Sequence, residues 1–125
     1  MILGVKKYLQ LAHLQLALRE DKRMSQAEVV MRVRFKSNLT LKQINEVIET
    51  RAPEFEALSG LKQKYYLQDI ATGEYAGLFI WETLHDFEEY RESKLRETTA
   101  KAYQTPGEPN IEVYKVLKVL RGTIA

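Results

Sequence analysis

The chain of 125 residues contains no cysteine, two histidines and six glycines. The absence of cysteine excludes disulfides, thiolate metal sites, iron–sulfur clusters and cysteine nucleophiles. His13 and His85 are far apart in the sequence, so we expect no metal site built on histidines. The glycines form no phosphate-binding loop, no dinucleotide-binding fingerprint and no Gly-x-Ser-x-Gly nucleophile elbow. Thiol chemistry and the enzyme classes that depend on these motifs are therefore excluded.

The composition that remains is typical of one globular domain. Hydrophobic residues make up 45% of the chain and charged residues 29%, and a domain of this length has room for a proper core. The net charge of +2 is unevenly distributed. Residues 1–24 hold five basic and two acidic residues, a net +3, and residues 25–125 carry −1. The larger part is therefore not a basic module that binds nucleic acid.

Residues 1–24 are predicted to form an amphipathic helical extension that precedes a domain at residues 25–125. Aliphatic residues cover a wide face of this helix, and Lys6, Gln10 and His13 form a narrow polar stripe. The apolar run is shorter than the roughly 20 residues that cross a membrane, and its polar residues fit a signal peptide poorly. We expect the helix to dock on the domain or on a partner chain in a cytoplasmic protein. A helix lying on a membrane surface, or an upstream extension, is the alternative.

The domain begins with strand and then helix signals. Alternation over residues 29–36 predicts a strand, which we expect to be central in its sheet. Residues 41–58 have helical spacing, with Thr40 as N-cap and Gln43 as its capping-box partner. Pro53 predicts a kink or break near residues 51–52. Gly60 is expected to end the helix in a left-handed conformation.

The second half of the domain contains further predicted strands and a second helix. Strands are predicted at residues 61–69 and 75–83 with a turn at 71–74 between them, followed by one helix that ends near Tyr103 and a strand at 111–120. The order is β-α-β-β-α-β. It predicts an α+β, ferredoxin-like fold with a four-stranded antiparallel sheet.

Both faces of the predicted sheet are apolar. In the third strand, Phe79 and Trp81 lie on one face, and Leu78 and Ile80 lie on the other. Two helices cover only one face of such a sheet, and a solvated outer face would show polar alternation. We therefore expect a homodimer that packs sheet against sheet. The N-terminal helix is the alternative cover.

Three segments of the domain form a recognisable pattern: SGLKQKYY at 59–66, YAGLFIW at 75–81 and FEEY at 87–90. The pattern resembles the YdhR-like monooxygenase group of the dimeric α/β-barrel superfamily, which includes antibiotic-biosynthesis monooxygenases. The residues that match the group's two strands are Lys64, Tyr66, Gly77, Phe79 and Trp81. Ser59 and Ala76 depart from it, because a proline and a glycine are usual there. The resemblance spans about residues 27–121 and implies a dimeric α/β barrel.

The resemblance also implies a function. Its characterised members carry out cofactor-independent oxygenation of aromatic or quinol-type substrates, in which a substrate carbanion reacts with oxygen. Such a protein needs an apolar pocket, hydrogen-bond donors for the phenolate and exclusion of water. Other members have no known reaction, so a non-catalytic small-molecule-binding or structural homodimer is the alternative. An RNA-binding module of the same topology is disfavoured, because Gly77 follows Tyr75 without the basic and aromatic residues of its motif.

The candidate catalytic residues are Trp81, Tyr66 and His85. Tryptophan and tyrosine combine an apolar ring with a polar tip, and a histidine at a strand end has the pKa range of a general base. The structural alternatives are core positions for the two aromatic residues and an exposed helix entry for His85.

The candidate substrate-binding residues are Arg34, Lys64, Phe79 and Tyr90. Arg34 shares a strand face with Arg32, and arginine is rarely buried without a partner. We expect the two arginines either to pair across the dimer with Glu82 or Glu112, or to bind an anionic substrate through bidentate hydrogen bonds.

Overall fold

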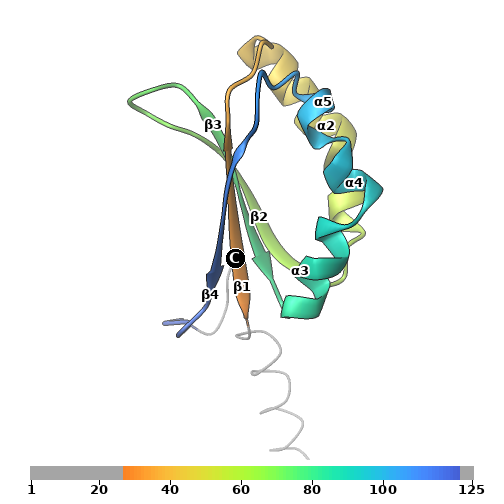
Figure 1. Cartoon of the computed structure of the whole chain (residues 1–125), viewed down its shortest axis with the longest axis vertical. Helices are drawn as coiled ribbons and strands as arrows, with labels where there is room; N and C mark the ends of the chain where they lie inside the picture. Colours follow the sequence, from red (N-terminus) through yellow and green to blue (C-terminus); the bar gives the residue numbers. More distant parts are fainter. Residues whose placement is uncertain (1–26, 122–125) are drawn as a thin grey trace, which may run out of the picture. The chain divides into compact units, whose positions relative to one another are not determined.

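The computed structural model describes residues 27–121, and all its helices and strands lie in one compact unit, Ala27–Leu117. The predicted N-terminal helix lies outside the described residues. In chain order the elements are β1 (Val29–Phe35), α2 (Leu41–Glu56), β2 (Leu61–Gln68), β3 (Tyr75–Trp81), α3 (Leu84–Arg91), α4 (Lys94–Glu97), α5 (Thr99–Ala102) and β4 (Asn110–Lys115) (Figure 1). No helix in residues 27–121 is long and apolar enough to cross a membrane.

The four strands form one antiparallel sheet in the order β2-β3-β1-β4. β1 is central, as predicted, and the ferredoxin-like fold is confirmed. The register places Phe79 of β3 between Lys64 of β2 and Met31 of β1. Met31 in turn pairs with Val113 of β4. Because side chains alternate along a strand, these four residues form a row on one face of the sheet.

The helices cover that face, and the other face of the sheet carries no helix of the unit (Figure 1). The core between the two layers is strongly aromatic. Its buried residues are Val29, Met31, Phe55, Phe79, Trp81, Phe87 and Tyr90. Trp81 is only 1% exposed and stacks on Phe79 at 6.2 Å between ring centres. The most tightly filled part of the layer therefore lies where β1 begins and β3 ends.

Helix α2 begins with the predicted capping box and does not break at Pro53. Thr40 Oγ1 accepts a hydrogen bond from the Gln43 backbone, and the Gln43 side chain accepts one from the Thr40 backbone. The helix continues through Pro53 to Glu56, so the predicted break is wrong. Proline removes one backbone donor, but the buried Phe55 ring packs on Phe79 and Tyr90 and holds the last turn in place.

Gly60 does not have the left-handed backbone that the sequence predicts, since its φ is not positive. Glycine is needed there for space. A Cβ at this position would lie 2.1 Å from Cγ of Asp86. Asp86 belongs to the N-terminal cap of α3, in which Thr83 Oγ1 accepts from the Asp86 backbone and donates to the Asp86 carboxylate. The glycine thus lets the end of the α2–β2 connection pass close to the start of α3.

The single helix predicted up to Tyr103 is instead three short helices, α3, α4 and α5. The first interruption is at Ser93. Its hydroxyl donates to the carbonyl of Tyr90 and accepts from the backbone of Arg96, which ends α3 and caps α4. Short hydroxyl side chains compete with the helix in this way. The prediction failed because charged residues on either side of Ser93 maintain a helical pattern across it.

Strand β4 ends at Lys115, five residues before the predicted end at Leu120. Its neighbour in the sheet is β1, whose first residue, Val29, pairs with Lys115. Beyond that pair one more backbone hydrogen bond forms, from Val116 to Glu28. Apolar residues continue to alternate in the sequence after Lys115, but β1 has no further residue with which they could pair.

Candidate functional site

A cavity of about 280 Å³ lies between the sheet and the helices. The sheet contributes Met31, Val33, Phe35, Tyr66, Gly77 and Phe79. The helices contribute Leu41, Ile44, Ile48, Tyr90, Thr99 and Ala100. Its residues on β1 run toward the end of the strand, whereas Val29 at the start of β1 belongs to the filled core. The cavity therefore occupies the end of the layer where β1 ends and α2 begins.

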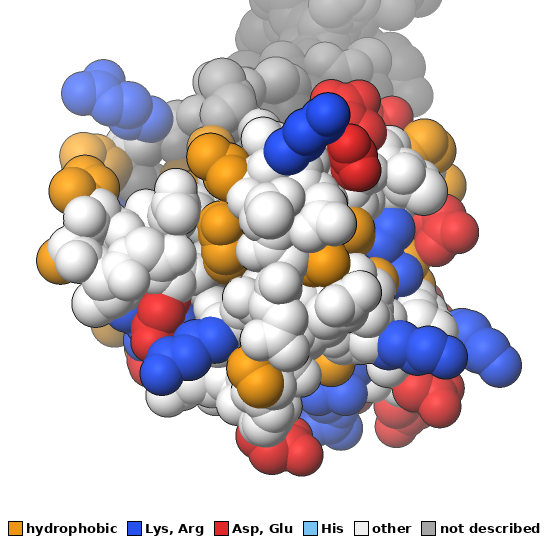
Figure 2. Space-filling model, turned by 90° about the horizontal axis from the view of Figure 1, so that it is seen from above, with side chains coloured by type: hydrophobic (Ala, Val, Ile, Leu, Met, Phe, Trp, Pro, Cys, Tyr) orange, Lys and Arg blue, Asp and Glu red, His pale blue; other side chains and the backbone are white. Residues whose placement is uncertain are grey.

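Charged side chains gather around the periphery of the molecule, with hydrophobic side chains exposed between them, when it is seen from above (Figure 2). Within the cavity wall itself the charged residues are Lys64, Arg96, Glu97 and Glu108. Most of the remaining wall is aliphatic or aromatic. Apolar pockets with a few polar groups are typical of small-molecule sites.

Gly77 lies in the middle of the sheet row that forms the cavity floor. It pairs with Val33 of β1 and Tyr66 of β2, and all three line the cavity. A Cβ at position 77 would lie 3.0 Å from Cε1 of Phe79. Because Gly77 has no side chain, there is space above the sheet at this position, and the Phe79 ring lies next to Gly77 in that space.

Lys64 brings an amine into these aromatic surroundings. Its Nζ lies 3.3 Å from the ring centre of Phe55, and 4.4 Å from those of Tyr66 and Phe79. Burial and, to a smaller extent, the positive charge of Arg51 together lower the pKa of Lys64 to about 7. Desolvation disfavours the ammonium form. At neutral pH this amine is therefore poised between its charged and neutral forms.

Three tyrosines of the cavity wall keep their protons. Burial raises the pKa of Tyr90 to about 12 and that of Tyr103 to about 12, and burial also raises the pKa of Tyr66. A protonated phenol donates one hydrogen bond and also accepts. These phenols are thus neutral at physiological pH, and that of Tyr90 has a hydrogen bond with the Thr99 side chain.

Arg51, on α2, is a residue that sequence reasoning missed. Its guanidinium donates to the carbonyl of Leu95 and to the hydroxyls of Thr98 and Thr99. These bonds tie α2 to the segment that carries α4 and α5. Pro53, two residues further on, predicts a helix break in this stretch and gives no signal for the hydrogen bonds of Arg51.

The structure brings four of the seven predicted site residues together. Lys64, Tyr66, Phe79 and Tyr90 all line the cavity. Trp81 lies in the filled core and not in the cavity wall, and its indole N–H is buried without a hydrogen-bond partner among residues 27–121. The wall does not include His85, whose side chain is 76% exposed on α3 and forms a pair with Glu89 at 2.9 Å.

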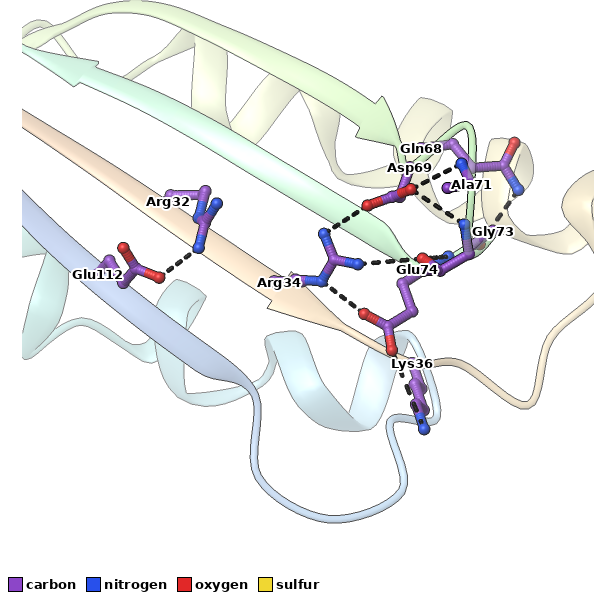
Figure 3. Close-up of polar contacts among 10 residues, drawn as sticks. Arg32, Arg34, Lys36, Gln68, Asp69, Ala71, Gly73, Glu74 and Glu112 are labelled. Carbon is purple, nitrogen blue, oxygen red and sulfur yellow. Dashed lines mark hydrogen bonds and ion pairs between the residues drawn. The ribbon is translucent and has the colours of Figure 1, made fainter.

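Arg34 lies on the face of the sheet that faces away from the cavity. It contacts Asp69 at 2.8 Å and Glu74 at 2.5 Å, both from the β2–β3 hairpin (Figure 3). These hydrogen bonds, led by the one to Asp69, raise the pKa of the Arg34 guanidinium. Arg32 pairs with Glu112, so the predicted partner forms its ion pair within the chain (Figure 3). Both arginines are thus neutralised by carboxylates of the same chain.

Within residues 27–121, no group of three or more His, Asp or Glu side chains converges on a position that could hold a metal ion. The cavity wall offers a ligand polar groups of several kinds: the Lys64 amine, phenols, hydroxyls, amides and the charged side chains of Arg96, Glu97 and Glu108. They suit a ligand that is held by hydrogen bonds and charge.

The fold is shared with proteins of the antibiotic biosynthesis monooxygenase type. A search of solved structures finds SnoaB, a cofactor-independent oxygenase from Streptomyces nogalater, with a TM-score of 0.61 and 16% sequence identity over 75% of this chain and 97% of that one. A candidate antibiotic biosynthesis monooxygenase from Caulobacter crescentus has a TM-score of 0.63 and 12% identity, over 80% of this chain and 99% of that one. No protein-family model and no curated protein matches the sequence.

A dimeric ferredoxin-like protein of unknown function from Thermobifida fusca is also similar in structure. Its TM-score is 0.59 and its identity 13%, over 74% of this chain and 94% of that one. At these identities the similarity concerns the fold, and a fold alone does not define a reaction. The chain therefore has the ferredoxin-like fold of these proteins.

Proposed function

We propose that the chain is a cofactor-independent monooxygenase that acts on a small aromatic or quinol-type substrate. The observation that carries the proposal is the apolar, aromatic-lined cavity of about 280 Å³ between sheet and helices. The fold it shares with SnoaB, a cofactor-independent oxygenase, supports the same reaction class.

The cavity has the features that this chemistry needs. An activated methylene of the substrate loses a proton, and the resulting carbanion passes electrons to dioxygen. One oxygen atom stays on carbon as a carbonyl and the other leaves as water. Apolar walls keep bulk water from the carbanion, and the Tyr66 and Tyr90 hydroxyls are donors for the oxygen that gains negative charge. Trp81 acts in this proposal by supporting the Phe79 ring on which it stacks.

Oxygen uptake with anthrone as substrate tests the proposal directly. We expect uptake with the wild-type protein and a fall of about tenfold or more in Tyr66→Phe, because a positioned donor is lost. Tyr65→Phe is the matched control. Tyr65 immediately precedes Tyr66 in β2, is equally exposed at 37% and does not line the cavity. Unchanged turnover in both Tyr66→Phe and Trp81→Phe would remove these residues from the mechanism.

The alternative is a non-catalytic homodimer that binds a small molecule in the same cavity. The positions of Trp81, His85 and Arg34 outside the cavity wall favour this alternative. The two functions differ in one measurement, since a binding protein takes up the aromatic molecule but consumes no oxygen.

The proposed dimer forms through the face of the sheet that carries no helix. Tyr65 and Tyr114 are large side chains exposed on this face, at 37% and 48%. Arg32 on the same face is already paired within the chain, which removes a charge that would oppose burial. The similar fold of the dimeric Thermobifida fusca protein supports this assembly.

A further inference from the structure

We propose that Lys64 accepts a proton from the ligand of the cavity, and that this ligand is a planar aromatic weak acid such as a phenol or an enol. The inference rests on the proposed function only in using the same cavity. It assigns the proton-accepting atom, Lys64 Nζ, and the chemical class of the group that it deprotonates.

The first argument is the position of the amine. Lys64 lines the cavity from β2, and the contacts of its Nζ are the faces of three aromatic rings, those of Phe55, Tyr66 and Phe79. Ring faces attract an ammonium group electrostatically, but each contributes less than a buried carboxylate would. Among the described residues, no carboxylate forms an ion pair with Lys64. A cation formed here would therefore gain an anionic partner only from a ligand.

The second argument is the charge of the surroundings. The titratable groups that face this part of the cavity are Arg51 and Glu56 from α2, Tyr66 from β2, Tyr90 from α3, Arg96 and Glu97 from α4, Tyr103 and Glu108. The tyrosines are neutral, and the remaining groups are two cations and three carboxylates. Of these charges, that of Arg51 lowers the pKa of Lys64, so it opposes a permanent charge on Lys64 and favours an anion beside the amine.

The proposed step is a proton transfer with no change in oxidation state. The O–H bond of the ligand breaks, its electron pair stays on oxygen, and the proton forms a new N–H bond at Nζ. The products are an aromatic oxyanion and an ammonium group held among three ring faces. Because the pKa of Lys64 is lowered to about 7, the amine is able to accept this proton near neutral pH, where an ordinary lysine is already protonated.

Binding of 4-nitrophenol and of its methyl ether, 4-nitroanisole, to the full chain tests the proposal. The nitrophenolate absorbs visible light and the neutral phenol does not, so the spectrum of the bound probe reports where its proton is. We expect the bound probe to be the phenolate in wild-type protein at a pH below the probe's own pKa. This spectrum needs no variant, so the test holds even where a variant fails to fold.

Two lysine variants complete the test. In Lys64→Met we expect the phenolate band to vanish and nitrophenol affinity to fall about tenfold or more, because an ion pair is lost. Affinity for nitroanisole should remain within about twofold. Lys62→Met is the matched control, since Lys62 lies on the same strand and does not line the cavity. It should behave as wild type with both probes.

The outcomes separate the two proposals. If nitroanisole binds but bound nitrophenol stays neutral, or is ionised equally in Lys64→Met, the role of Lys64 is overturned and the cavity remains a ligand site. If neither probe binds the wild-type protein, the cavity fails as an aromatic site and the proposed function fails with it.

Discussion

Nζ of Lys64 lies 3.3 Å from the ring centre of Phe55. This contact connects strand β2 with the last turn of helix α2. Phe55 itself is buried and packs on Phe79, whose ring centre is 4.4 Å from the same Nζ. The amine is therefore enclosed by residues from three elements of the fold. Its protonation is coupled to folding as well as to any ligand.

The first prediction concerns stability and pH. In the unfolded chain Lys64 holds its proton up to about its ordinary pKa of 10.5, and in the folded protein it releases it at about 7. Between these values the unfolded state binds more protons, so this residue makes the free energy of unfolding rise with pH. This contribution to the free energy of unfolding is complete above pH 10.5 and absent below pH 7. One proton contributes at most about 1.4 kcal/mol for each pH unit.

Urea unfolding from pH 7 to pH 10.5 measures this contribution. In Lys64→Met we expect a flatter dependence than in wild type, because methionine does not titrate. Lys42→Met, at an exposed position on α2, serves as control and should follow the wild-type curve. Parallel curves for wild type and Lys64→Met would show that Lys64 titrates normally in the folded protein.

The second prediction concerns the contact between Gly60 and Asp86. Gly60→Ala places a Cβ 2.5 Å from the Asp86 Cβ as well as 2.1 Å from its Cγ, and neither atom is the end of a flexible side chain. We expect a loss of about 1–3 kcal/mol in the free energy of unfolding, from overpacking and from disturbance of the α3 cap. A double-mutant cycle with Asp86→Gly checks the cause. The alanine should cost clearly less in that background, and equal costs would place the strain elsewhere.

The third prediction concerns the hairpin carboxylate Asp69. Its Oδ1 accepts from the backbones of Ala71 and Thr72, and its Oδ2 pairs with Arg34. The backbone hydrogen bond from Thr72, followed by those from Arg34 and Ala71, lowers the pKa of Asp69 to about 2. The ionised form therefore stabilises the fold above the ordinary pKa of 3.8, and this contribution disappears as the pH falls from 3.8 through about 2.

Asp69→Asn keeps the acceptor oxygen and removes the charge. We expect the difference in unfolding free energy between wild type and Asp69→Asn to shrink on acidification through this range. Glu49→Gln, at an exposed position on α2, provides the comparison for a carboxylate without such contacts. A difference that stays constant from neutral to acid pH would mean that the ionised carboxylate contributes nothing.

Much of the fold was predictable because its signals are local. Alternation along the strands depends on the two-residue repeat of a β-strand, and the cap at Thr40 depends on Gln43, three positions further along the chain. Where a predicted end of a helix or strand was wrong, a contact between residues distant in the sequence determined where the element ends. Phe55 holds the last turn of α2 after Pro53 through rings on α3 and β3, and the start of β1 sets the end of β4.

The candidate site was predictable only in part, for a related reason. Alternation predicts that Phe79 and Trp81 share one face of their strand, but only the register places Lys64 and Tyr66 on that face, and alternation does not say which end of the face is filled. The filled end depends on the packing of Trp81 and Phe87 from separate elements. The partners of Arg34 lie 35 or more positions away in sequence. Ion pairs across such distances depend on strand register, which a single sequence does not specify.

The fourth prediction concerns the cavity floor. Gly77→Ala places a methyl group 3.0 Å from the Phe79 ring, so the ring has to shift and the cavity becomes shallower. We expect affinity for 4-nitroanisole to fall about tenfold, since methyl-sized changes in apolar pockets have effects of this order. Leu78→Ala changes the next residue on the opposite face and should bind the probe as wild type does. Unchanged binding in Gly77→Ala would place the ligand away from this floor.

The fifth prediction concerns the open face of the sheet. Its exposed aromatic side chains, Tyr65 on β2 and Tyr114 on β4, lie on opposite edge strands of the same face, and burying both in a dimer removes apolar surface from water. Sedimentation at micromolar concentration should give twice the chain mass of 14.6 kDa. Tyr65→Glu and Tyr114→Glu would each bury a carboxylate without a partner in the interface, so the double variant should sediment mainly as a monomer. A wild-type monomer would contradict the dimer, and a dimer unaffected by both substitutions would assign the interface to another surface.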